Sequence, residues 1–136
     1  MLRLIPPAQL HDVWGWVRNG LMDCIGRTQE RWLPEDVFVH IKAGTSHLFA
    51  IEHKGDDVGF TVLCQHADSD GPVLFVWALW VEPGAGKPIE GALYEALEQK
   101  AREIGARRVR MQSPRKGWER RAYWTQTAAI YEHEVM

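Results

Sequence analysis

Nine consecutive apolar residues, at positions 73–81, form the longest uninterrupted apolar run in the sequence. The run is far shorter than the roughly 20 apolar residues that a membrane-spanning helix requires. Turn-forming residues bound it, with Gly71-Pro72 before it and Pro83-Gly84 after it. A run of this length between turns is typical of a strand that is buried on both faces. We therefore expect residues 73–81 to form the central strand of a sheet that is covered on both sides.

Before this run, the sequence predicts an edge strand and a helix. Leu2–Ile5 is short and apolar, and it ends at Pro6, whose missing N–H is tolerated in an edge strand. Over residues 10–21, apolar side chains recur at intervals of three and four, which predicts one face of a helix. Gly15 and Gly20 are poor helix formers, so we expect them to weaken this helix or to divide it.

A second helix and a hairpin follow. Pro34 is a suitable first-turn residue and Gly44 a suitable terminator, which predicts a helix between them. The spacing of apolar residues then changes to two over residues 48–53 and 58–65, which a short polar segment separates. This pattern predicts an antiparallel hairpin. We interpret residues 66–72 as a further turn.

Helices and strands also alternate in the second half of the chain. The predicted elements are a loop (83–88), a helix (89–104), a strand around Val109 and Met111, a helix (113–124) and a last strand (128–135). The complete order predicts an α/β (α+β) fold, with a mixed, mostly antiparallel sheet flanked by helices on both faces. We expect one domain over residues 1–136.

The composition excludes several classes of protein. The chain is 46% hydrophobic and 25% charged, with a formal net charge of −2 at pH 7, which is typical of a globular domain and excludes a disordered or polybasic chain. The two cysteines, Cys24 and Cys64, have apolar neighbours and are predicted to be reduced. Residues 1–7 lack a signal-peptide pattern, so we expect a cytoplasmic protein with no membrane partner.

Metal binding is not expected. The six histidines show none of the paired spacings that place two ligands on one helix face. The segment Asp68-Ser69-Asp70-Gly71 is similar to the start of a calcium loop, but it lacks the glutamate that would complete one. A turn explains these four residues fully.

The order and length of these elements resemble the GCN5-related N-acyltransferase (GNAT) superfamily over nearly all of the chain. Within that superfamily the chain looks like the small, diverged members found in bacteriophage genomes. The resemblance implies a transferase that moves an acyl (acetyl) group from acetyl-CoA or another acyl-CoA to an amine. It also implies a location in the host cytoplasm, or in the virion if the protein is phage-encoded.

In that family, the loop after the fourth strand binds the cofactor through amides at a helix N-terminus, which suits a pyrophosphate. The family pattern is Gln or Arg, two residues, Gly, one residue, then Gly or Ala. With Val81 and Pro83 as anchors, its three marked positions fall on Gly86, Ile89 and Gly91, of which Gly91 alone agrees. Ile89 is therefore expected to hinder close approach, and Pro88 removes one amide donor. The alternative is a turn that only joins a strand to a helix. The implied cofactor-binding residues are Trp80, Val81, Gly84, Ala85, Gly86, Lys87 and Gly91.

The family also places a tyrosine on its last helix, where the phenol protonates the departing thiolate. Tyr123 occupies the matching position, although the four other positions of that motif differ from the family. The resemblance implies that the strand of residues 73–81 and the strand at Val109 part near their ends, with the thioester between them. Backbone amides near Trp80 would polarise its carbonyl. The alternative for Tyr123 is an aromatic side chain that packs beside Trp124.

No sequence motif identifies the base that would deprotonate the amine. Glu82 directly follows the central strand and is the predicted catalytic carboxylate, with Glu52 and His53 as the other candidates. A carboxylate at the end of a buried strand is otherwise only the first solvated residue of the loop.

Positive charge is concentrated near the C-terminus. Residues 100–121 hold nine Lys and Arg against two Glu, a local charge of +7, and the rest of the chain carries −9. This face predicts either a nucleic-acid partner or a protein assembly partner, or it is an ordinary solvated surface. The basic residues of the predicted contact are Arg107, Arg108, Arg110, Arg115, Lys116, Arg120 and Arg121. Two alternative functions therefore stand beside the transferase: a catalytically inactive GNAT-fold protein in a bacteriophage particle, and a nucleic-acid-binding protein.

Overall fold

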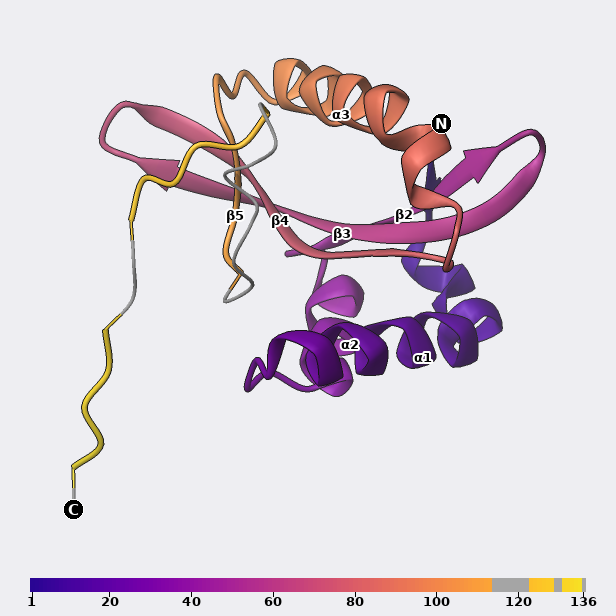
Figure 1. Cartoon of the computed structure of the whole chain (residues 1–136), viewed down its shortest axis with the longest axis horizontal. Helices are drawn as coiled ribbons and strands as arrows, with labels where there is room; N and C mark the ends of the chain where they lie inside the picture. The colour runs from indigo at the N-terminus through magenta and orange to yellow at the C-terminus, as the bar shows by residue number, and fades with distance from the viewer. Residues whose placement is uncertain (114–122, 129–130, 136) are drawn as a thin grey trace.

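The computed structural model describes residues 1–113, 123–128 and 131–135. In chain order its elements are β1 (Leu2–Ile5), a short 3-10 helix η1 (Pro7–Gln9), α1 (Leu10–Thr28), α2 (Pro34–Ala43), β2 (His47–His53), β3 (Asp56–Asp68), β4 (Gly71–Val81), α3 (Gly86–Glu103) and β5 (Val109–Met111). A five-stranded sheet lies between two helical layers, with α1 and α2 on one face and α3 on the other (Figure 1). The predicted fold class is confirmed.

The strands are ordered β1-β2-β3-β4-β5. Each neighbouring pair from β1 to β4 is antiparallel, and β4 and β5 are parallel. The predicted edge strand, both predicted N-terminal helices and the predicted hairpin are therefore found. The strand expected at the centre is interior, between β3 and β5, while β3 occupies the middle of the sheet.

The predicted turn at residues 66–72 is wrong in extent. β3 continues to Asp68 and β4 begins at Gly71, so the connection shrinks to Ser69 and Asp70. The cause is a contact from a distant part of the chain. Arg110 of β5 donates two hydrogen bonds to the Asp68 carboxylate, at 3.1 and 2.7 Å, which holds the end of β3 beside β4. The same contact explains the acidic residues that were similar to a calcium loop.

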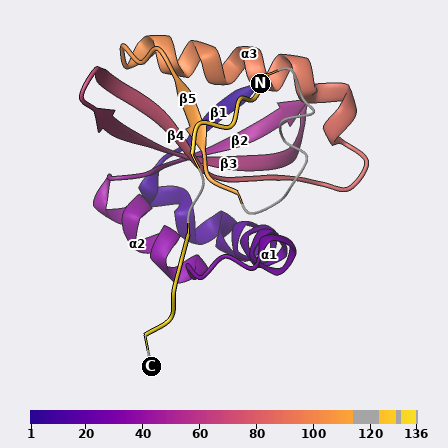
Figure 2. The same cartoon turned by 60° about the vertical axis from the view of Figure 1, so that its left-hand side comes forward.

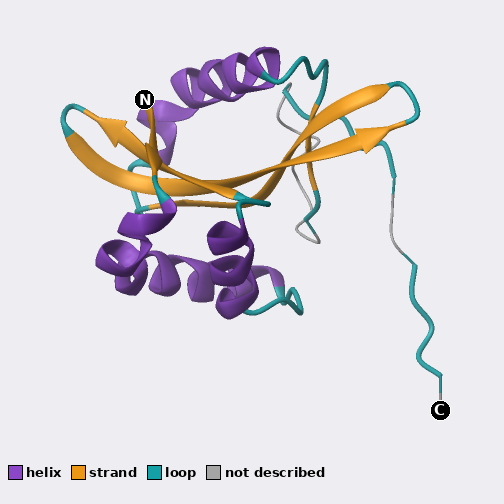
Figure 3. Ribbon diagram, turned by 180° about the vertical axis from the view of Figure 1, so that it is seen from behind, coloured by secondary structure: helices purple, strands orange, loops and turns teal. Residues whose placement is uncertain are grey.

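Two apolar cores form, one on each face of the sheet, and β4 contributes to both. Ala78 packs into the core under α1 and α2, whereas Leu74 and Val76 pack into the core under α3. Leu74, Val76 and Ala78 would share one face in a regular strand. The extra residue Trp77 in β4 reverses the alternation, so the strand gives apolar side chains to both cores. The view from behind shows the helical layers on either side of the sheet (Figure 3).

Helix α1 runs unbroken through both glycines, so the expected division is wrong. Gly15 is exposed, with no atom within 4 Å of the position a Cβ would take. Gly20 is buried against the sheet, where an added Cβ would lie 2.4 Å from Phe60 Cε2 and 2.9 Å from Trp80 Cδ2. Gly20 therefore serves close packing of the helix on β3 and β4 and does not end the helix.

Substitution of Gly20 tests this packing. We expect Gly20→Ala to lower the free energy of unfolding by about 1–3 kcal/mol, because Phe60 is fully buried and cannot move aside. The matched variant Gly15→Ala places the same methyl group on the same helix in open space and should instead add about 0.5–1 kcal/mol. Urea unfolding of both variants measures the difference. Equal effects from the two substitutions would contradict this account of Gly20.

The structure describes only part of the predicted C-terminal helix and last strand. Most of the predicted helix at residues 113–124 lies outside the described residues. The described residues of the predicted last strand, 128 and 131–135, form no strand. Tyr131 is 92% exposed and Val135 is 90% exposed, so their alternation with polar residues places no apolar face against the sheet. Residues 131–135 run away from the sheet (Figure 2).

Two further expectations concern the cysteines and the membrane. Neither cysteine is in a disulfide, and the buried Cys64 lies 3.0 Å from the Ser46 hydroxyl. No helix in the described part of the chain has both the length and the apolar character needed to cross a bilayer.

Candidate functional site

The site begins where β4 parts from β5. Within the described residues, β5 pairs with β4 only from Leu74 to Val76, and β4 continues to Val81. The pairing of β4 with β3 also shifts after Val76, because Val76 opposes Leu63 while Ala78 opposes Val62, which leaves Trp77 as the bulged residue. Bulges bend a strand and re-aim its side chains. The expected parting of these two strands is found, and it starts at Trp77.

The hydrogen-bond alternation of β4 decides which main-chain groups face the open side. The Glu82 N–H donates to the Val58 carbonyl at 2.8 Å, so the amide of Glu82 faces β3. In an antiparallel pair, alternate residues turn their amides away from the partner strand. The amides of Leu79 and Val81 therefore point toward the open side, and the amide of Trp80 points toward β3. The amides expected near Trp80 are therefore those of its neighbours, Leu79 and Val81.

The side chain of Trp80 has a structural position on the α1 face. Its indole N–H donates to Asp23 Oδ2 at 3.0 Å, and its ring stacks on Phe60 at 5.6 Å between centroids. The Cys24 thiol, on the same part of α1, lies 3.5 Å from the Leu79 carbonyl oxygen. The C-terminal end of α1 therefore borders the open edge of β4.

The loop after β4 is short and exposed. Its turn is closed by the Ala85 N–H, which donates to the Glu82 carbonyl at 3.0 Å, and Gly84 has a φ of +85° that favours glycine. Helix α3 begins at Gly86, and its N-cap Ala85 has no side-chain acceptor for the first amides. The amides of Gly86 and Lys87 have no acceptor within the helix and carry its positive dipole. These donors fit a pyrophosphate.

The expected obstruction of this loop by Ile89 is wrong, whereas Pro88 does remove one of the free amides of the first turn of α3. Ile89 is 1% exposed and packs into the core with Leu93 and Leu97, so its side chain faces the sheet and not the loop. Pro88 lies in the first turn of α3, where its missing N–H breaks no hydrogen bond of the helix. Gly91 lies further along α3, exposed, and its amide belongs to the helical ladder. Its cofactor role rests on the resemblance alone.

Tyr123 belongs to a group of three aromatic side chains on the α3 side. Its ring stacks on Tyr94 of α3 at 4.1 Å between centroids, with the planes 8° apart. The Trp124 indole N–H donates to the Tyr94 hydroxyl at 3.2 Å. Burial, and to a lesser extent the charge of Glu98 and the neighbouring Tyr94, raise the pKa of Tyr123 to about 12. The phenol therefore keeps its proton at neutral pH.

The sequence did not point to Tyr94. Its only signal was its position five residues after Ile89 on the predicted helix, which carries no chemical information. Its partnership with Tyr123 appears only in the folded chain, where the two rings stack.

The three predicted bases lie near one end of the sheet. Glu82 follows β4 and is exposed. Glu52 and His53 end β2, where the register pairs them with Asp57 and Asp56 of β3. The Glu52 carboxylate is 3.4 Å from the Arg3 guanidinium and so already has a cationic partner. None of these contacts selects one residue as the base.

The predicted basic face is partly neutralised. Arg108 and Arg110 form ion pairs with Asp68 and Asp70, and the hydrogen bonds from Arg110 are the main reason that the pKa of Asp68 is lowered. Arg107 is exposed. The remaining predicted contacts, Arg115, Lys116, Arg120 and Arg121, lie outside the described residues.

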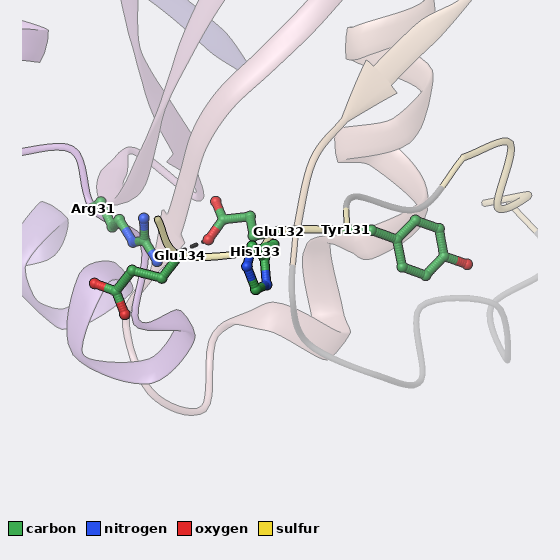
Figure 4. Close-up of a pocket in the computed structure, with 5 residues that line it drawn as sticks. All are labelled: Arg31, Tyr131, Glu132, His133 and Glu134. Carbon is green, nitrogen blue, oxygen red and sulfur yellow. Dashed lines mark hydrogen bonds and ion pairs between the residues drawn. The ribbon is translucent and has the colours of Figure 1, made fainter. Parts of the chain in front are cut away.

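A pocket at the segment between α1 and α2 does not include any predicted site residue. Arg31 and the C-terminal residues Tyr131, Glu132, His133 and Glu134 line it (Figure 4). Its one ion pair joins Arg31 to Glu132 at 2.8 Å, and both side chains are largely exposed. In the part of the chain that the structure describes, no cluster of metal-binding side chains is found.

Comparison with known proteins agrees with this fold. The family model described as "Acetyltransferase (GNAT) family" matches residues 17–123, which is most of the chain. The chain therefore belongs to the GNAT acetyltransferase family, whose members use acetyl-CoA and acylate amines. No curated protein is similar enough in sequence to count as a match.

Solved structures share the fold across the whole chain. A ribosomal-protein-alanine N-acetyltransferase from Brucella melitensis biovar Abortus 2308 has a TM-score of 0.65 at 18% identity, covering 100% of this chain and 97% of the other. The aminoglycoside N-acetyltransferase AAC(6')-Iy in complex with CoA has a TM-score of 0.64 at 17% identity, covering 100% and 99%. The aminoglycoside acetyltransferase meta-AAC0020, from an uncultured soil metagenomic sample and in complex with sisomicin, has a TM-score of 0.68 at 12% identity, covering 100% and 96%.

Proposed function

We propose that this chain transfers an acyl group from acyl-CoA to a primary amine along the open edge of β4. The observation that carries the proposal is the parting of β4 from β5 at Trp77, followed by an exposed loop and the uncapped start of α3. A free strand edge and a helix N-terminus together offer a line of main-chain donors. Membership in the GNAT family supplies the reaction, and this edge supplies a place for it.

The residues that would hold the cofactor follow from these donors. The amides of Gly86 and Lys87, with the exposed Lys87 ammonium, would bind the pyrophosphate. The outward amides of Leu79 and Val81 would hold the chain of the cofactor along β4 and orient its carbonyl oxygen. When bound, acyl-CoA supplies the activated acyl group. Gly84, Ala85 and Gly91 keep the roles that the resemblance implies for them.

The chain's own part in the chemistry is to position groups and to move protons. The Tyr123 phenol would give its proton to the departing sulfur, since its raised pKa keeps it protonated. A carboxylate is needed to take a proton from the amine, and Glu82 is the carboxylate that the sequence predicts for it. The acceptor class is a primary amine, and proteins of similar structure include a ribosomal-protein-alanine N-acetyltransferase and an aminoglycoside acetyltransferase.

Calorimetric titration of the chain with acetyl-CoA tests this function directly. We expect saturable binding in the micromolar range, with CoA released as free thiol when an amine acceptor is added. A titration without heat at high micromolar acetyl-CoA would overturn the proposal.

The loop gives a separate prediction. An added Cβ at Gly86 meets no atom within 4 Å, so Gly86→Ala should fold normally. The methyl group would occupy the space through which a phosphate approaches the amides. Loss of one charge-assisted hydrogen bond, at about 1.5–3 kcal/mol, corresponds to a CoA affinity lower by about ten- to a hundredfold. The variant Gly15→Ala, on the far layer, should bind CoA as the unmodified chain does, and equal affinities for all three proteins would show that the loop is not the site.

The alternative functions stay predictions. A role in assembly of a bacteriophage particle would appear as fixed stoichiometry in purified particles. Binding of nucleic acid through Arg107 and its basic neighbours would weaken steeply with salt, and the ion pairs of Arg108 and Arg110 reduce the charge available for it. Location in the cytoplasm remains part of the same proposal.

A further inference from the structure

The segment between α1 and α2, residues 29–33, lies beside the point where β4 leaves β5. The Trp32 indole meets the Trp77 indole edge to face, at 5.9 Å between centroids and 70° between planes. Trp77 is the bulged residue that directly follows Val76, the last residue of β4 to pair with β5. Trp32 therefore borders the start of the open edge, on the face that α1 and α2 cover.

A carboxylate is fixed at the same place. The Trp32 indole N–H donates to Glu30 Oε2, and the Glu30 side chain is half-buried. Burial raises the pKa of Glu30, while the hydrogen bond from Trp32 opposes part of that rise. A carboxylate with a raised pKa is a better proton acceptor for an amine than one in bulk water.

Different side chains therefore lie on the two faces of the sheet. The aromatic group of Tyr94 and Tyr123 lies on the α3 side, and the tryptophan pair with Glu30 lies on the α1 and α2 side. Their separation allows a donor and an acceptor to approach the open edge of β4 from opposite faces. An aromatic wall beside a carboxylate is the chemistry that recognises an ammonium group.

We propose that Glu30 is the base for the acceptor amine and that Trp32 and Trp77 form the wall of the acceptor subsite. The inference rests on the proposed function and names the acceptor side of that same site. An ammonium group gives one proton to a Glu30 carboxylate oxygen, and Glu30 later releases it to solvent. The freed lone pair forms the C–N bond as the thioester C–S bond breaks. The sulfur takes the proton of the Tyr123 phenol, and the second proton of the nitrogen restores that phenol.

Several other charged groups near this segment have partners of their own, and His133 and Glu134 line an exposed pocket with Arg31. Arg31 turns outward to Glu132 at 2.8 Å, and Arg27 pairs with Asp23 on the last turns of α1. His40 of α2 meets Trp77 edge to face, and its Nδ1 lies 2.8 Å from the Thr45 hydroxyl. Glu82, the carboxylate that the sequence predicts, lies in the exposed loop.

Binding of the amine can be followed without turnover. The probe is benzylamine hydrochloride, and the signal is the indole N–H resonance of Trp32 in a ¹H–¹⁵N spectrum, assigned through Trp32→Phe. We expect the probe to shift this resonance at neutral pH, and we expect Glu30→Gln to abolish the shift. The matched control is Glu35→Gln, because Glu35 is exposed and pairs only with Arg18 on the surface in the described structure. No shift in the unmodified chain, or a shift that survives in Glu30→Gln, would overturn the inference.

Rates give the second measurement. With acetyl-CoA and benzylamine, Glu30→Gln should lower kcat/KM by about 10²–10⁴-fold and remove the acidic limb of its pH profile, while Glu35→Gln should do neither. A comparable loss in Glu82→Gln with Glu30→Gln unaffected would transfer the role to Glu82 and overturn the inference. Failure to bind acetyl-CoA at all would instead overturn the proposed function, and the indole titration stands whether or not benzylamine is turned over.

Discussion

Tyr123→Phe should lower kcat for acyl transfer by about 10²–10⁴-fold, the range that a positioned proton donor contributes. The substitution removes only the hydroxyl. The ring that stacks on Tyr94 at 4.1 Å remains, so the fold and the affinity for acyl-CoA should change little. Steady-state kinetics with acetyl-CoA and calorimetry on the same samples separate the two effects. A fall in cofactor affinity with kcat intact would show that Tyr123 is a packing residue.

Tyr94→Phe is the companion variant, because its phenol is the other one in the aromatic group. The Tyr94 hydroxyl accepts a hydrogen bond from Trp124, so its removal leaves that indole N–H without this partner. We expect a modest loss of stability and a much smaller loss of kcat than for Tyr123→Phe. The reverse order of the two kcat values would assign the proton to Tyr94.

The pKa of Tyr123 has a consequence for pH dependence. An unfolded chain titrates this phenol near 10.0, whereas the folded chain does so at about 12. Between these values the folded state holds more protons, so the free energy of unfolding falls as pH rises through this window. Below this pH window, Tyr123 is protonated in both the folded and the unfolded state, so its titration gives the pH–rate profile no alkaline limb.

The fold was predictable where the sequence has a local pattern of apolar residues. The apolar run became β4, and the alternating segments became the β2 and β3 hairpin. Gly20 was expected to weaken or divide the helix, but its role depends on contact with Phe60, which is far away in sequence. Likewise, β3 extends to Asp68 because of a side chain from β5, which no local pattern records.

The site was less predictable than the fold. A motif aligned on Val81 and Pro83 gave Ile89 a position at the cofactor, whereas its spacing with Leu93 and Leu97 predicts the buried face of the helix, where the structure places it. Main-chain donors carry no residue signature, so the sequence places the amides only near Trp80, and the strand pairing is needed to show that those of Leu79 and Val81 face outward. Glu30 lies in a connection without any motif, and its significance depends on the bulge in β4.

Gly59→Ala should be the most damaging small substitution in the sheet. An added Cβ would lie 2.2 Å from the Trp80 carbonyl oxygen and 2.9 Å from Val81 Cα, and both are backbone atoms of β4 that cannot rotate away. The strands must separate there, so we expect a loss of about 3 kcal/mol or more in the free energy of unfolding. The same displacement moves the outward amides of the β4 edge, so acyl-CoA affinity should fall in parallel.

The control for this variant is Gly26→Ala, because an added Cβ on that exposed turn of α1 meets no atom within 4 Å. It should gain about 0.5–1 kcal/mol from helix propensity. Urea unfolding and calorimetry with acetyl-CoA then compare the two. If Gly59→Ala loses CoA affinity but keeps full stability, the β4 edge affects binding independently of the packing between β3 and β4. Full stability and full affinity would mean that β3 and β4 tolerate a wider spacing, and the geometry of the open edge would lose its support.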